Sequence, residues 1–270
     1  MSEYTLLLAA FLIYFLVMAM GFLNLFKGKQ EISRISWYLA VFGFALHSLS
    51  LLVRTVSSRQ APFTSMYESV NFLGWSCVLA TIIFIRKYRL QKTAPYLWLL
   101  VVALMALASS PALPKEVTPL VPALQSYWLW LHVSVTLLGE AFLAVAFVAS
   151  ILYLLSAEKE TAEENSSGRK ERLDFIAYRA VTVGFPLFTL GALVFGMIWA
   201  SKAWGRYWGW DPKEVWSLIT WLFYALYLHT RLVHGWRGKK SALIAILGFL
   251  AALFTFFGVN YLLRGLHSYV

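Results

Sequence analysis

Long apolar runs broken by polar stretches dominate the chain. An α-helix needs about 17–25 mostly apolar residues to cross a bilayer. Eight runs approach or reach this length, at 4–26, 35–53, 69–85, 94–110, 130–155, 178–200, 215–233 and 242–263. One connection is strongly polar, the segment 156–174, which we interpret as a cytoplasmic loop or a helix extension. The pattern predicts an all-α polytopic membrane protein, a bundle of eight transmembrane helices forming a single domain over residues 1–270.

Composition agrees with this prediction. The chain is 60% hydrophobic and 13% charged, whereas charged residues make up roughly 25% of soluble domains. The first apolar run has no basic region before it and is long enough to span, so we expect a transmembrane helix there and not a signal peptide. Cys77 is the single cysteine. The chain therefore has no internal disulfide, no CxxC pair and no CxxCH haem-attachment motif, which excludes a thiol oxidoreductase and a c-type cytochrome.

The distribution of basic residues predicts the orientation. The net charge is +10. Sixteen of the lysines and arginines follow the first, third, fifth and seventh runs, and seven lie in the other connections and at the C-terminus. Cytoplasmic loops are enriched in Lys and Arg, so both termini and the connection between runs six and seven are expected outside. The same rule, with attraction to anionic headgroups, accounts for the charge without a nucleic-acid partner.

The segment WGRYWGWDPKEVWSLITW, residues 204–221, holds five of the twelve tryptophans; we call it the tryptophan segment. Asp211, Pro212 and Glu214 have the order of a helix start. Aspartate suits the N-cap, proline suits the first helical position, and glutamate at the third closes a capping box. The seventh span is therefore predicted to begin here.

Two interpretations of the tryptophans stay open at this point. Indoles form belts at membrane interfaces, but Trp204, Trp208 and Trp210 alternate here with Gly205 and Gly209 in one connection. Rigid aromatic side chains with glycines between them also suit a large planar ligand. Anionic groups of such a ligand would find cations nearby, at Lys202, Arg206 and Lys213.

The positions of the histidines suggest haem-iron ligation. His132 lies at the outer start of the fifth run, and His267 follows the eighth. Two imidazoles at the level of the tryptophan segment would form an axial pair for a haem iron. His229 lies deep in the seventh run and His47 inside the second, where a hydrogen bond between helices is the alternative to ligation.

Two further polar residues lie near these histidines. His234 lies at the cytoplasmic end of the seventh run, where an ordinary solvated histidine is expected. Glu140 lies two turns below His132 on much the same helix face. It is interpreted either as a residue that orients an iron ligand or as the partner of an arginine.

The tryptophan segment resembles the signature loop of the cytochrome c assembly family, which includes CcsA-, ResC- and CcmC-type haem-handling proteins. LWLHVSV around His132, LYLHTRL around His229 and GLHSY around His267 fall where CcsA-type proteins carry histidines. The early segments FALHSLSLLVR and SMYESVNFLGW also resemble the family, so the similarity covers nearly the whole chain.

The resemblance implies a haem b cofactor and its binding residues. It implies that His132 and His267 are the axial ligands of an external haem site and that His229 is one ligand of an inner site, whose second ligand comes from a partner. The ring would be held by the loop between Trp204 and Trp216, with the candidate residues Trp204, Arg206, Trp208, Trp210, Asp211 and Trp216. His47 is a candidate haem-binding residue without an assigned role.

The resemblance also implies a function: haem transport and presentation for covalent attachment to apocytochrome c. The chain would be one component of a haem–apocytochrome c synthetase, with a CcsB/ResB-type partner, an apocytochrome carrying CxxCH as substrate, and a place in the bacterial cytoplasmic membrane. The alternative is a HemX-like regulator of haem biosynthesis. A third hypothesis is a helix bundle that binds a quinone or another small molecule, with structural histidines.

Overall fold

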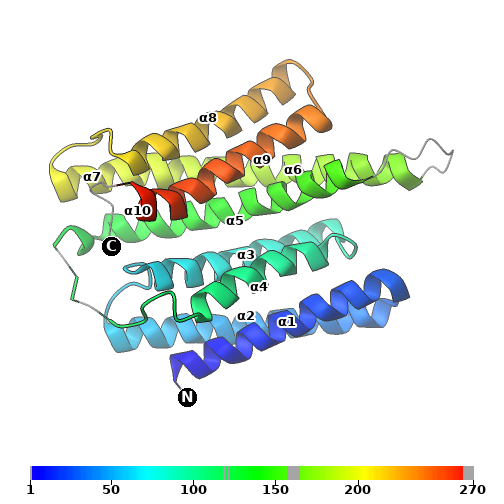
Figure 1. The fold of residues 1–270 in the computed structure, drawn as a ribbon, viewed down its shortest axis with the longest axis horizontal. Helices are drawn as coiled ribbons and strands as arrows, with labels where there is room; N and C mark the ends of the chain where they lie inside the picture. The colour runs from blue at the N-terminus through cyan, green and yellow to red at the C-terminus, as the bar shows by residue number, and fades with distance from the viewer. Residues whose placement is uncertain (1, 118, 121, 157–164, 264–270) are drawn as a thin grey trace. The chain divides into compact units, whose positions relative to one another are not determined.

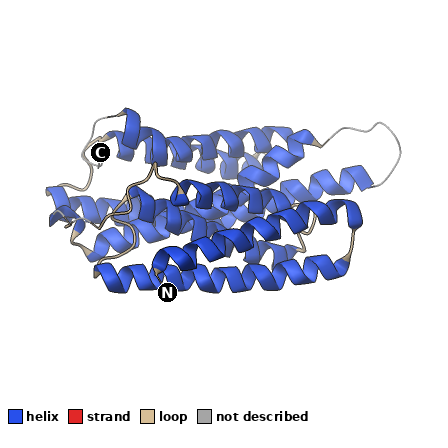
Figure 2. Cartoon of the chain, turned by 60° about the horizontal axis from the view of Figure 1, so that its bottom comes forward, coloured by secondary structure: helices blue, strands red, loops and turns tan. Residues whose placement is uncertain are grey.

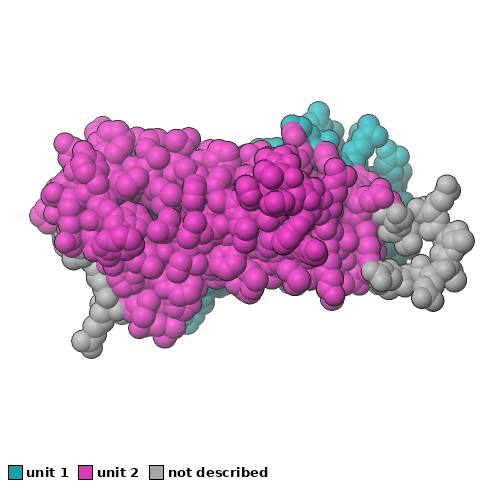
Figure 3. All heavy atoms as spheres, turned by 90° about the horizontal axis from the view of Figure 1, so that it is seen from above, with its two compact units in different colours: residues 1–121 teal, residues 122–270 magenta. Residues whose placement is uncertain are grey.

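The computed structural model of the chain describes residues 2–117, 119–120, 122–156 and 165–263. Helices joined by short connections make up nearly all of this part of the chain, and it contains no β-strand (Figure 2). The predicted all-α class is therefore confirmed. The chain divides into two compact units, residues 1–121 and residues 122–270 (Figure 3). The single domain over 1–270 remains a prediction.

Unit 1 is a four-helix arrangement. The helix α1 packs against α2 and α4, and α3 packs against the same two neighbours, so the four helices close into a ring (Figure 1). Their bounds are α1 Glu3–Lys27, α2 Gln30–Ser58, α3 Met66–Tyr88 and α4 Ala94–Ser109. Ser2 and Ser65 cap the N-termini of α1 and α3 through their side chains, as serine commonly does.

A buried ion cluster joins three helices of unit 1. Arg54 of α2 donates from Nη1 to Glu3 Oε1 at 2.8 Å and from Nε to Glu68 Oε1 at 2.9 Å. The backbone N–H of Thr64 donates to the other oxygen of Glu68 at 2.8 Å. All three charged residues are buried. Because charges are costly to bury without partners, this cluster specifies how α1, α2 and α3 meet.

Unit 2 is built around α5 (Tyr127–Leu155), which packs against the long helical run that follows it and against α9. That run is continuous but changes its hydrogen-bonding pattern, from an α-helix to a π-helical segment and back. The run consists of α6 Asn165–Phe188, η2 Thr189–Phe195 and α7 Gly196–Trp204. The other elements of unit 2 are η1 Pro122–Leu124, α8 Pro212–Val233, α9 Lys239–Leu253, η3 Phe254–Gly258 and α10 Val259–Leu262.

Helices occupy all eight predicted spans, but the predicted number of spans is not confirmed. Six helical stretches in the described part of the chain are long and apolar enough to cross a membrane. The apolar helix α4 has only 16 residues. The helix α8 is long enough, but its tryptophans, tyrosines and charged ends make it less apolar than the six.

The predicted polar loop 156–174 is partly helical. From Asn165 onward its residues form the first turns of α6, so this part is the helix extension that the sequence allowed. Residues 157–164 lie outside the described part of the chain.

Candidate haem site

The start of α8 has the capping box that the sequence predicts. Asp211 adopts the N-cap conformation and its Oδ1 accepts a hydrogen bond from the Lys213 backbone N–H at 3.0 Å. The Glu214 carboxylate accepts from the backbone N–H groups of Asp211, at 3.2 Å, and Gly209, at 2.7 Å. Glu214 therefore ties the loop of residues 205–211, which joins α7 to α8 (Figure 1), to the first turn of α8.

Two positions in this loop have left-handed backbone conformations. Gly205 ends α7 with φ 73°, and Trp210 has φ 57°. Arg206 folds back over Gly209, since a Cβ added to that glycine would lie 2.7 Å from Arg206 Nε. The glycines are expected to let a ligand approach the backbone closely. At Gly209 the side chain of Arg206 occupies part of that space.

Replacing Glu214 with alanine should loosen this loop without unfolding the protein. Both backbone hydrogen bonds to its carboxylate would be lost, at a cost of about 1 kcal/mol. Amide hydrogen exchange at Gly209 and Asp211 should accelerate. A matched control is Lys202→Ala, which removes an exposed side chain in the last turn of α7; if the two variants exchange alike, the proposed role of Glu214 is wrong.

The tryptophans divide into separate contacts instead of one flat surface. Trp204 packs edge-on against Trp199, with ring centroids 4.8 Å apart. Trp208 and Trp210 form a second edge-on pair at 5.8 Å, and Trp210 is 71% exposed. Trp216 packs against a phenylalanine of η3 at 4.2 Å. Exposed indole surface is thus concentrated at Trp210, where a planar ligand could stack.

His132 is oriented from two sides. Its Nδ1 lies 2.9 Å from the carbonyl oxygen of Gly191, and its ring stacks on Trp199 at 5.7 Å with an interplanar angle of 8°. A carbonyl oxygen only accepts hydrogen bonds, so Nδ1 carries the proton and the neutral ring has its lone pair on Nε2. Iron-ligating imidazoles in proteins are commonly oriented in this way, through the nitrogen that does not bind the metal.

Glycines allow the helical run 165–204 to approach α5 closely enough for this contact. A Cβ on Gly196 would lie 3.1 Å from His132 Nδ1, and one on Gly191 would overlap the backbone nitrogen of Thr136. Further along the same run, a Cβ on Gly184 would lie 2.9 Å from the carbonyl oxygen of Gly139. Small residues permit such close backbone contacts between membrane helices.

Lys213, in the first turn of α8, has its ammonium group directed toward α10. Lys213 Nζ donates to Asn260 Oδ1 at 2.9 Å, and the buried Glu140 of α5 interacts electrostatically with Lys213. Both interpretations of Glu140, as a residue that orients an iron ligand and as the partner of an arginine, stay predictions. Because Lys213 is directed toward Asn260, Lys202 and Arg206 are the better candidates for meeting an external anion.

The structure separates His229 from the loop of residues 205–211. It lies 17 residues after the first residue of α8, about 25 Å along the helix axis. Its side chain is exposed and packs edge-on against His234, with ring centroids 5.5 Å apart. The assignment of His229 to a second, distinct site stays a prediction.

His47 belongs to unit 1, whereas the other nine predicted site residues belong to unit 2. It is fully buried. Its Nε2 lies 2.7 Å from Asn71 Oδ1 and its Nδ1 lies 3.4 Å from the Tyr14 hydroxyl. Both ring nitrogens are therefore used in contacts between helices, which is the alternative that the sequence offered for this residue. A haem-binding role for His47 stays a prediction.

The predicted pairing of His132 with His267 is not tested, because His267 lies outside the described residues. Sequence analysis missed Trp199, Gly191 and Gly196, which surround His132. Trp199 lies within an apolar span where an indole is an ordinary core residue, and nothing local distinguishes the two glycines from packing positions.

Three comparisons place the chain among known proteins. The profile of the family described as "Cytochrome C assembly protein" matches residues 63–267. A protein of Chlamydomonas reinhardtii named cytochrome c biogenesis protein CcsA is 43% identical over 227 residues, covering 82% of this chain and 64% of the relative. The chain thus spans less than two thirds of that protein's length.

Other relatives match over most of their length. CcsA of Prochlorococcus marinus (strain MIT 9303) is 36% identical over 295 residues, covering 97% of this chain and 92% of the relative. The solved structure of the cytochrome c haem lyase CcmF superposes with a TM-score of 0.70, covering 95% of this chain and 47% of that one. At 20% identity this likeness shows the fold alone. The chain belongs to the cytochrome c assembly protein family, as a CcsA-type member with a role in cytochrome c biogenesis.

Proposed function

We propose that this protein binds haem b and presents it for covalent attachment to apocytochrome c. The observation that carries the proposal is the environment of His132. His132 Nδ1 donates a hydrogen bond to the Gly191 carbonyl oxygen, and the imidazole ring stacks on Trp199. Because Nδ1 carries the proton, the lone pair of the neutral ring is on Nε2, the atom that would bind iron. The residues present thus fit a haem ligand.

The tryptophan segment would bind the porphyrin ring. Trp210 offers exposed indole surface, and Glu214 holds the loop beside it through two backbone hydrogen bonds. Arg206 is exposed at the same loop and supplies a cation for an anionic group. Haem, when bound, supplies the vinyl groups that react with the two thiols of a CxxCH motif. The protein would position and expose the ring while the apocytochrome brings its thiols.

Two further histidines complete the proposal. His267 would be the second axial ligand beside His132. His229 would be one ligand of an inner site. Because its side chain is exposed on unit 2, the remainder of that site would come from outside this unit, as a CcsB/ResB-type partner would provide. The chain would then be one component of a haem–apocytochrome c synthetase.

The proposed location is the bacterial cytoplasmic membrane, with the tryptophan segment and both termini outside. The excess of Lys and Arg in alternate connections supports this orientation. The relatives named above are cytochrome c biogenesis proteins, which favours this function over a HemX-like regulator.

Haem content of the purified chain, with and without a co-expressed partner, tests the proposal. We expect a bis-histidine haem spectrum. The His132→Ala, His267→Ala double variant should lose the contribution of the external haem, and His229→Ala should lose that of the inner haem. His234→Ala is the control and should keep both. A double variant with the full haem content and spectrum of the unaltered chain would refute the external site.

A further inference from the structure

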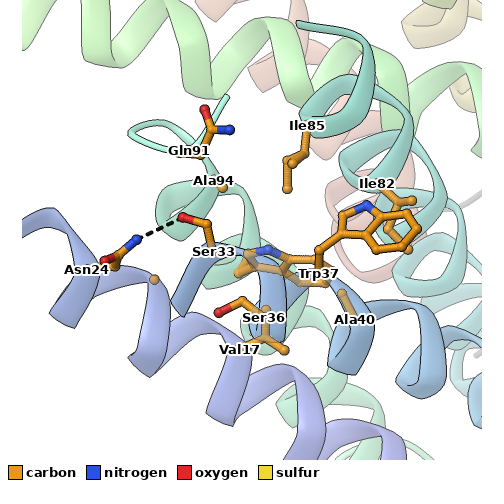
Figure 4. Close-up of a pocket in the computed structure, with 12 residues that line it drawn as sticks. Val17, Asn24, Ser33, Ser36, Trp37, Ala40, Ile82, Ile85, Gln91 and Ala94 are labelled. Carbon is orange, nitrogen blue, oxygen red and sulfur yellow. Dashed lines mark hydrogen bonds between the residues drawn. The ribbon is translucent and has the colours of Figure 1, made fainter. Parts of the chain in front are cut away.

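Unit 1 contains a hollow that the proposed function does not use. It lies where α1 meets α2 and α3 meets α4, and it is partly open (Figure 4). With the open space at its mouth it contains about 480 Å³ of empty volume. Part of its wall is apolar and is formed by Val17 of α1 and by Ile82 and Ile85 of α3. The enclosed part has a cavity volume of about 50 Å³, which is room for a few water-sized groups. A ligand would therefore insert one small group there and leave its bulk along the open side.

The polar groups of this hollow are incompletely paired. Asn24 Nδ2 donates to Ser33 Oγ at 2.8 Å, the bond drawn in Figure 4. Ser36 Oγ and Trp37 Nε1 are buried, and neither has a hydrogen-bond partner within the described part of the chain. Buried polar atoms in native proteins are nearly always paired. Two adjacent donors in one hollow therefore indicate a ligand that offers acceptor oxygens.

The charge around the hollow indicates an anionic ligand. The ends of α1–α4 on this side, with their two connections, carry one acidic residue, Glu31, and seven basic ones: Lys27, Lys29, Arg34, Arg86, Lys87, Arg89 and Lys92. The Arg86 guanidinium lies over the Trp37 ring, 5.5 Å from its centroid. A cation therefore lies against the face of the indole ring whose N–H is unpaired within the described part of the chain.

We propose that this hollow binds one anionic phospholipid. Its phosphate would lie among the basic residues, with Arg86 nearest the indole. Its ester or phosphate oxygens would accept hydrogen bonds from Trp37 Nε1 and Ser36 Oγ. An acyl chain would leave along Ile82 and Ile85 through the open side. Basic pockets between membrane helices bind anionic headgroups by the same combination of charge and hydrogen bonding.

Native mass spectrometry of the full chain in neutral detergent tests this proposal, with phosphatidylglycerol as the probe and phosphatidylcholine as the uncharged comparison. We expect phosphatidylglycerol to bind more tightly. The Ser36→Ala, Trp37→Phe double variant should weaken its binding on the order of tenfold. Trp75→Phe is the matched control, since the Trp75 indole already donates to Ser48 Oγ at 2.8 Å. It should bind like the unaltered chain.

Arg86→Gln provides a second test, because this exposed residue can be replaced with little risk to folding. It should weaken binding of phosphatidylglycerol and leave phosphatidylcholine unchanged. Equal binding of the two lipids, or unaltered binding by the double variant, would overturn the proposal. So would equally tight binding of sn-glycerol 3-phosphate, which would identify a soluble phosphate as the ligand. The test is independent of haem content, so its failure leaves the proposed function untouched.

Discussion

Substituting Gly191 with alanine is expected to destabilise unit 2 by about 1–3 kcal/mol and to weaken haem retention at His132 by about tenfold or more. The added methyl would overlap the Thr136 backbone nitrogen and lie 2.7 Å from its hydroxyl oxygen. The two helical runs would have to separate. That movement would draw the Gly191 carbonyl away from His132 Nδ1, which it now contacts at 2.9 Å.

Thermal unfolding and the haem-to-protein ratio of the purified chain measure the two effects. Gly168→Ala is the matched control, because a Cβ there meets nothing within 4 Å and the residue is in α6 of the same helical run. Alanine there should be neutral or stabilise by up to about 1 kcal/mol. If Gly191→Ala loses stability but retains haem fully, the Gly191 carbonyl does not position His132.

Substituting Arg54 with alanine is expected to cost about 3–5 kcal/mol of folding free energy, the largest stability effect that we predict. The carboxylates of Glu3 and Glu68 would stay buried at the junction of α1, α2 and α3 without the guanidinium that contacts both. Lysine should recover only part of the loss, because one ammonium cannot reproduce the spacing of Nη1 and Nε.

The unfolding midpoint in lipid nanodiscs and the yield of folded protein measure this effect. Arg34→Ala removes an exposed arginine of the same helix and should change stability by less than about 0.5 kcal/mol. Comparable losses in the two variants would mean that the buried cluster is not what stabilises unit 1.

The distance of His132 from its partners shows why its surroundings could not be predicted from local patterns. Gly191 lies 59 residues away in the chain, and its carbonyl belongs to the π-helical segment η2, within a span that has the hydropathy of an ordinary helix. Trp199 is 1% exposed and reaches His132 only because α7 continues the same run. Lys213 donates to Asn260, 47 residues further along the chain.

The sequence by itself determined the helical class, the positions of the apolar helices and the start of α8 at Asp211. These features depend on residues close together in the chain. The hydropathy of a segment indicates whether it lies in lipid or in water, and a capping box is formed within four consecutive residues. Tertiary structure alone decided which backbone carbonyl orients His132, which residues engage both nitrogens of His47, and which buried donors of α2 stay unpaired within the described part of the chain. Those outcomes depend on close contacts between helices far apart in the chain, and hydropathy and spacing do not encode such contacts.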